Sequence, residues 1–230
     1  MFYEDLNLIF VHQRKCAGQS IRAALGPLPA ELDGMYQDGV LSPEWDDRVR
    51  NHLKIAVIRN PWDRFVSGWR YCRSTRQRSI LQALENLPRR GHDYRHVTRQ
   101  QTETIFGADG RISVDFVLRF ECLQADFDAL CKMLGKDPEP LPHANKGSGE
   151  TRYSDLFGPQ ERELFAKHFA NDVRSLGYSF DRPGCPPAQG AIGRRHFLGP
   201  LQLFLCRYGL LGPAASRARQ RYGEDRAVRP

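Results

Sequence analysis

Two segments of this 230-residue chain share one layout, in which an apolar run turns through a short polar loop into a helix-forming stretch. The first apolar run is residues 8–11, and the loop after it holds Lys15. The second is residues 53–58, which lead to a helix start at Asn60-Pro61. Short apolar runs without alternation are typical of parallel strands that are buried on both faces. The chain is therefore expected to be an α/β domain with a parallel sheet.

The rest of the chain continues this alternation. A third strand is expected over residues 114–118, and residues 88–102 are expected to form a long polar loop. Capping residues, prolines and apolar positions at helical spacing predict helices over residues 20–25, 43–51, 62–73, 79–87, 123–134 and 159–169. We expect these helices to cover both faces of the sheet.

The net charge of +7 is unevenly distributed. Residues 183–230 contain eight arginines and two acids, so this tail carries +6 and residues 1–182 only +1. We therefore predict one domain over residues 1–182, followed by a basic, partly apolar tail, and expect no nucleic-acid partner. Within the tail an apolar stripe at helical spacing suits either a peripheral contact with an anionic membrane surface or packing on the domain; it consists of Leu201, Phe204, Leu205, Tyr208 and Leu211.

The six cysteines show no C-x-x-C pair and no spacing suited to zinc. We expect free thiols in a reducing compartment. The first residues lack the basic and apolar regions of a signal peptide, and no uninterrupted apolar span reaches the roughly 18 residues of a transmembrane helix. These features predict a cytoplasmic protein, with the tail as a peripheral attachment to the inner membrane face.

The loop after the first strand has the features of an anion site. Lys15 can reach an anion that is held by the main-chain N–H groups around Gly18 at the start of a helix. The order of lysine and glycine differs from the usual ATP loop, and the second strand ends in Arg59 where a magnesium site would often place an acid. These differences favour an anionic ligand without a metal. The alternative is a plain strand-to-helix crossover with a solvated lysine.

A second anion site is expected at the end of the second strand. Arg59 lies where ligands of open α/β sheets bind, and its planar fork suits a phosphate. Ser67 comes about 9 Å along the helix that starts at Pro61. Asp63 and Arg64 are interpreted as local helix charges. Two separated anion sites fit a ligand with phosphates on both sides of one ribose.

The two loops, and several later segments in the same order, resemble the motifs of sulfotransferase family 2, which includes carbohydrate and chondroitin sulfotransferases and bacterial relatives. Residues 9–20 resemble I-F-V-H-I-P-K-T-A-G-T-S, and residues 59–67 resemble R-N-P-x-D-R-x-x-S. Further matches are Arg119-Phe120-Glu121 with Asp126-Phe127, Leu141-Pro142-His143-Ala144-Asn145-Lys146 and Gly177-Tyr178-Ser179-Phe180.

The resemblance implies a P-loop NTPase-like, nucleotide-kinase-like fold. It also implies transfer of a sulfuryl group from 3′-phosphoadenosine 5′-phosphosulfate to a hydroxyl of a carbohydrate or similar acceptor, without a metal. Lys15 would be catalytic, and the donor would be held by Arg14, Lys15, Cys16, Ala17, Gly18, Gln19, Ser20, Arg59, Ser67 and Lys146. Where the family pattern has proline and two threonines, this chain has Arg14, Cys16 and Gln19.

The sequence indicates the general base, which takes the proton of the acceptor hydroxyl, less clearly than it indicates the anion sites. His96, in a segment that resembles the family element H-W-x-P-Q, is the candidate; a solvated loop histidine is the alternative. His12 is expected to orient the first loop. The altered loop and the uncertain base leave open a second class of function, a weakly active or inactive nucleotide-binding module attached to a membrane.

Overall fold

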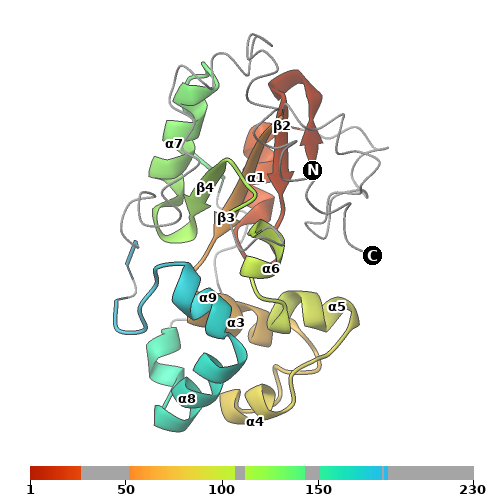
Figure 1. Ribbon diagram of the computed structural model, residues 1–230, viewed down its shortest axis with the longest axis vertical. Helices are drawn as coiled ribbons and strands as arrows, with labels where there is room; N and C mark the ends of the chain where they lie inside the picture. The colour runs from red at the N-terminus through yellow and green to blue at the C-terminus, as the bar shows by residue number, and fades with distance from the viewer. Residues whose placement is uncertain (27–51, 107–111, 143–150, 183, 186–230) are drawn as a thin grey trace, which may run out of the picture.

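The computed structural model describes residues 1–26, 52–106, 112–142, 151–182 and 184–185 (Figure 1). The helix expected over residues 43–51, Lys146 and nearly all of the tail lie outside these ranges. Within the described part, no helix is long and apolar enough to cross a membrane.

A four-stranded sheet forms the centre of the described part, in the order β1 (Phe2–Tyr3), β2 (Leu8–Val11), β3 (Leu53–Ile58) and β4 (Phe116–Arg119). Strands β2, β3 and β4 are parallel, and the short β1 joins β2 antiparallel at the edge. In the register, Val11 pairs with Ala56 and Ile58 with Arg119. The carboxyl ends of the three parallel strands therefore meet at one edge of the sheet.

Both faces of the sheet are buried, as expected from the apolar runs. On one face, Phe10 and Ile55 pack with α1 (Gly18–Leu25) and α7 (Leu123–Met133). On the other, Ile9 and Ile58 belong to a core with residues of α3 (Pro61–Tyr71), α4 (Ile80–Glu85) and α8 (Pro159–His168). The predicted α/β class with helices on both faces is confirmed.

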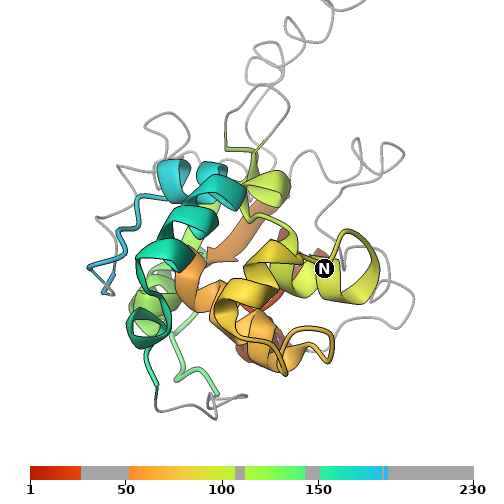
Figure 2. The same cartoon turned by 90° about the horizontal axis from the view of Figure 1, so that it is seen from below.

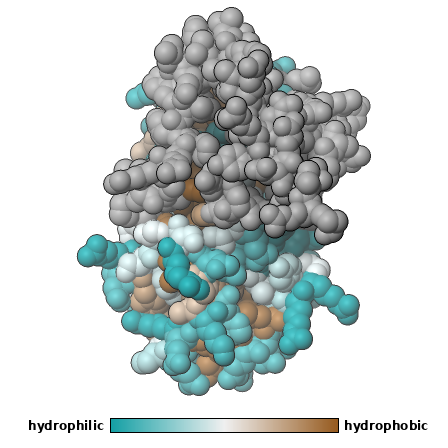
Figure 3. Space-filling model, in the orientation of Figure 1, coloured by the Kyte–Doolittle hydropathy of each residue, from teal (hydrophilic) through white to brown (hydrophobic). Residues whose placement is uncertain are grey.

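The helices beyond the carboxyl edge hold together through aromatic packing. Trp62 and Phe65 on α3 contact Phe165 on α8, and Phe165 stacks on Phe169 with ring centroids 4.4 Å apart. The short α9 (Ala170–Ser175) follows α8, and all these helices gather at the same end of the sheet (Figures 1 and 2). On the face seen in Figure 3 their outer surface is mostly hydrophilic with small apolar patches.

The predicted loop over residues 88–102 is wrong. This stretch forms the helical turn α5 (Gly91–Asp93), the π-helical turn η3 (Tyr94–Thr98) and the start of α6 (Thr102–Ile105). The cause is packing against α3, because a Cβ built on Gly68 would lie 2.3 Å from the main-chain oxygen of His96. Glycine lets the two backbones approach, and a polar stretch that looks like a loop is ordered by this contact.

Three 3₁₀ turns complete the described elements: η1 (Glu4–Leu6), η4 (Phe120–Cys122) and η5 (Tyr153–Leu156). The first lies between β1 and β2, the second joins β4 to α7, and the third precedes α8.

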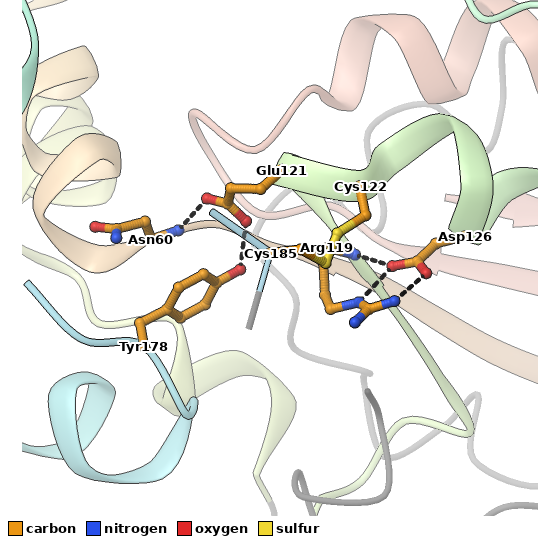
Figure 4. The surroundings of a disulfide bond; sticks show 7 residues. All are labelled: Asn60, Arg119, Glu121, Cys122, Asp126, Tyr178 and Cys185. Atoms are coloured by element: carbon orange, nitrogen blue, oxygen red, sulfur yellow. Dashed lines mark hydrogen bonds and ion pairs between the residues drawn. A yellow bond between two sulfur atoms is a disulfide. The ribbon is translucent and has the colours of Figure 1, made fainter. Parts of the chain in front are cut away.

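The expectation of free thiols is wrong for two of the six cysteines. Cys122, at the end of η4, and Cys185 form a disulfide with their Cα atoms 5.8 Å apart (Figure 4). Cys16, Cys72 and Cys131 are free and buried. The sequence spacing gave no signal for the bond, because its partners are 63 residues apart.

Candidate active site

The loop between β2 and α1 has the backbone of an anion site. Lys15 and Ala17 take left-handed conformations, with φ angles of 68° and 53°. Helix α1 starts at Gly18 without a hydrogen bond from any capping side chain, whereas Asn60 caps α3 and Ser79 caps α4. Its first N–H groups therefore remain available for an anion at the positive end of the helix. Ser20 lies inside α1 and not at its cap position, which Ala17 occupies, and its contact with the donor stays a prediction.

The side chain of His12 packs against this loop at Gly18. A Cβ built on Gly18 would lie 1.9 Å from Nε2 of His12, so any larger residue at the start of α1 would displace this imidazole. Burial, with a smaller effect from the charge of Arg14, lowers the pKa of His12 to about 4. The imidazole is therefore neutral at physiological pH and serves as packing, which agrees with its expected orienting role.

Lys15 carries the charge of the loop. Its ammonium lies over the ring of Tyr71, 4.1 Å from the centroid. Burial, followed by the charge of Arg59, lowers the pKa of Lys15. No ion pair joins Lys15 to an acid of the described residues. A half-buried cation without a counter-charge suits an anionic ligand.

Arg59 joins the two predicted anion sites. Its Nη1 donates to the main-chain oxygen of Lys15 at 2.9 Å. Its Nε and Nη2 bind the Asp63 carboxylate, each at 2.8 Å, and the guanidinium lies 4.1 Å over the ring of Phe120. Asp63 thus pairs locally as expected, and Arg59 fixes the loop between β2 and α1, which we call the donor loop for its predicted ligand. Its phosphate contact with Ser67, half-buried two turns along α3, stays a prediction.

A buried glutamine between these loops was not predicted. The side chain of Gln101 accepts from the Arg59 N–H at 2.8 Å and donates to the Arg59 carbonyl at 2.9 Å. The Cys16 thiol lies 3.5 Å from the same amide oxygen. Burial raises the pKa of Cys16 to about 11, so this residue is a neutral structural thiol. Gln101 lies outside every strand-end motif, so no pattern in the sequence predicted its role.

His96 lies close to Lys15, although the two are far apart in the chain. Its ring stacks on Tyr71 at 4.8 Å and on His92 at 4.3 Å, and its Nδ1 has no hydrogen-bond partner among the described residues. Burial, followed by the charge of His92, lowers the pKa of His96 to about 3. Both candidate catalytic groups therefore contact Tyr71, the exposed large apolar side chain of the described part.

The other predicted donor-binding residues lie around the same loop. Gln19 is exposed on α1, and Ala17 is partly exposed just before it. Arg14 is partly buried, and its carbonyl accepts from Nε of Arg64 at 3.2 Å. Arg64 also donates to the carbonyl of Arg95 at 3.5 Å. The interpretation of Arg64 as a local helix charge is wrong, because it reaches across to other segments.

Three of the sequence motifs meet at one carboxylate (Figure 4). Glu121 accepts from the Asn60 N–H and from the Tyr178 hydroxyl, both at 2.7 Å. The neighbouring Arg119 binds Asp126 with two hydrogen bonds at 2.6 and 2.8 Å. Residues that the motifs place far apart in the chain therefore build one support for the start of α3.

Comparison with known proteins supports the family resemblance of the motifs that meet at Glu121. A family model described as the sulfotransferase family matches residues 35–179, more than half of the 230 residues. The match begins after the first loop and includes Arg59, His96, Glu121 and Tyr178. Neither the curated proteins nor the solved structures contain a match. The matched region together with the ordered motifs shows that this chain belongs to sulfotransferase family 2.

Proposed function

We propose that the protein transfers the sulfuryl group of 3′-phosphoadenosine 5′-phosphosulfate to a hydroxyl of a carbohydrate or similar acceptor. The family match supports sulfuryl transfer in general. The observation that carries the choice of donor is the uncapped N-terminus of α1 beside the half-buried Lys15. This combination suits a phosphosulfate, whose oxygens accept hydrogen bonds from N–H groups and favour a nearby cation.

In the transfer step, the acceptor oxygen forms a bond to sulfur while the bond from sulfur to the 5′-phosphate oxygen breaks. Lys15 and the first N–H groups of α1 stabilise the negative charge that develops on the leaving phosphate. Arg59 keeps Lys15 in place through the Lys15 carbonyl. The adenosine 3′-phosphate would be held near Arg59 and Ser67, and Lys146 would contact the nucleotide.

His96 is the proposed acceptor of the hydroxyl proton. It is neutral, and the lone pair of its Nδ1 is free of partners among the described residues. A pKa of about 3 makes the isolated imidazole a weak base. A multiply charged donor beside Lys15 would offset the positive charges that lower this pKa, so donor binding would strengthen the base.

Calorimetric titration with 3′-phosphoadenosine 5′-phosphate tests this proposal. We expect saturable binding to the wild-type protein and a loss of roughly tenfold or more in affinity for Lys15→Met, because a charge-assisted contact is removed. The matched control is Lys167→Met, on the exposed side of α8. No binding, or equal affinity for both variants, would contradict the donor site.

A nucleotide-binding module without transfer activity is the second candidate. It is favoured by Cys16, which faces Gln101 and replaces a hydroxyl of the family pattern. Nucleotide binding without transfer to a broad acceptor panel would support it. The cytoplasmic location and the peripheral membrane contact of the tail stay predictions.

A further inference from the structure

A basic hollow lies beside the donor loop. It is lined by His12, Gln13, Arg14, Arg64, Arg95 and Arg99, with Gln100 and Thr104 at its margin. Among the described residues that line it there are four arginines and no acid, and Arg99 pairs with Glu103 outside the lining at 4.0 Å. Such a set of donors in one concave site gives a strongly positive local potential.

The buried cation of this hollow has no counter-charge. Arg64 is only 3% exposed, and its guanidinium donates to the carbonyls of Arg14 and Arg95. No carboxylate of the described residues pairs with it. A buried charge without an ion partner is costly, so an anion in the hollow would stabilise it.

Further donors in the hollow lack partners within the described part. Gln13 is 4% exposed, and its Nε2 makes no hydrogen bond; the same is true of Nε of Arg14. The amide oxygen of Gln100 accepts from the main-chain N–H groups of Asn171 and Asp172, which leaves its NH₂ group as the donor. Buried donors without acceptors are rare in folded proteins, and these gather where the positive potential is high.

We infer that this hollow is a binding site for a compact oxyanion group, a carboxylate, sulfate or phosphate. The hollow adjoins both parts of the candidate active site, because Arg14 precedes Lys15 and Arg95 precedes His96 in the chain. An anionic group on the acceptor would place its hydroxyl near both residues. This assignment of an acidic acceptor rests on the proposed function, whereas binding of the oxyanion itself does not.

Calorimetric titration of the full chain with sodium sulfate at constant ionic strength tests the site. We expect saturable binding that falls roughly tenfold or more in Arg14→Met, because a guanidinium contact is lost. Arg99→Met is a second variant, and Arg76→Met, exposed after α3, is the matched control. Lys15→Met removes sulfate binding at the donor loop and should leave the hollow occupied. Circular dichroism establishes that each variant is folded.

The result that overturns the inference is sulfate binding that is absent, or equal in Arg14→Met, Arg99→Met and the control. Arg99 is not among the predicted donor-binding residues, so loss of sulfate binding in Arg99→Met with nucleotide binding intact distinguishes a failed donor site from a failed hollow. Kinetics with an uncharged acceptor and its carboxylate-bearing analogue then identify the source of the anion. A rise in KM of roughly tenfold for the acidic acceptor alone in Arg99→Met, a residue outside the predicted donor-binding set, identifies the acceptor's own group. Sulfate binding without that rise identifies a free ion.

Discussion

At the scale of single residues, the partly buried Glu121 connects three distant segments. Its carboxylate receives hydrogen bonds from Asn60 and Tyr178, and burial raises its pKa. A buried carboxylate depends on each of its donors, because water cannot replace a lost one. The start of α3, and with it Arg59, therefore depends on a tyrosine from the end of the domain.

Tyr178→Phe removes one of these donors. We expect a loss of about 1–3 kcal/mol in the free energy of unfolding, because a hydrogen bond to a buried carboxylate disappears. Urea unfolding of both proteins measures the loss. Tyr94→Phe is the matched control: its hydroxyl donates to the exposed Glu103 at 3.1 Å, where water can substitute. Equal losses for the two variants would contradict the role given to Glu121.

His12 predicts a dependence of stability on pH. Its pKa falls from 6.5 in the unfolded chain to about 4 in the folded one, so the unfolded chain binds a proton more readily between these values. Its contribution is complete above pH 6.5 and is lost as the pH falls toward 4, by about 3 kcal/mol at most. In His12→Gln, the free energy of unfolding should lack this part of the decrease at pH 4.5, as measured by urea unfolding. A wild-type slope in His12→Gln would refute the assignment.

Some site residues could be predicted from the sequence and others could not. The closeness of Lys15 and Arg59 could be predicted because strand ends in parallel sheets meet at one edge. The hydrogen bond from Arg64 to the Arg14 carbonyl could not be predicted, because helical spacing suggests only local pairs. Gln101 was missed for the same reason: its partners are 42 and 85 residues away.

At the scale of elements, the sequence predicted strands and helix starts well, because these depend on residues that are close together in the chain. The strands β2 and β3 have the predicted bounds, and Asn60 and Ser79 cap α3 and α4 as expected. The turns α5 and η3 were missed because a tertiary contact with α3 orders them. Helical structure that depends on a distant backbone leaves little periodicity in its own sequence.

Gly68→Ala tests the contact between α3 and η3. The added methyl would meet the main-chain oxygen of His96, which cannot move without shifting η3. We expect a loss of about 1–3 kcal/mol in stability from overpacking, and a fall in transfer rate as His96 leaves its position. Thermal unfolding and initial rates measure the two effects. Gly184→Ala, whose Cβ would meet no atom within 4 Å, should change neither, and an unaffected Gly68→Ala would contradict this contact.

At the scale of the whole molecule, one disulfide ties residue 185 to the strand-end region after β4. It closes a loop of 63 residues that contains α7, α8 and α9. Disulfides persist in oxidising compartments, so this bond does not fit the reducing environment expected from the cysteine pattern.

Reduction of the disulfide should lower stability, because the unfolded chain regains freedom in a long loop. We expect about 2–4 kcal/mol, measured as a fall in the unfolding midpoint on addition of dithiothreitol. Cys185→Ser should show the lower midpoint with and without reductant, and Cys131→Ser, a free buried thiol, should keep the response. A wild-type midpoint that ignores reductant would exclude a stabilising bond.

Transfer of radiolabelled sulfate from 3′-phosphoadenosine 5′-phosphosulfate to a saccharide panel tests the central claim most directly. The proposed function predicts label on an acceptor in equal amount to the 3′-phosphoadenosine 5′-phosphate released, and no such product with Lys15→Met. Label that stays on the nucleotide, or appears only as inorganic sulfate, would contradict it.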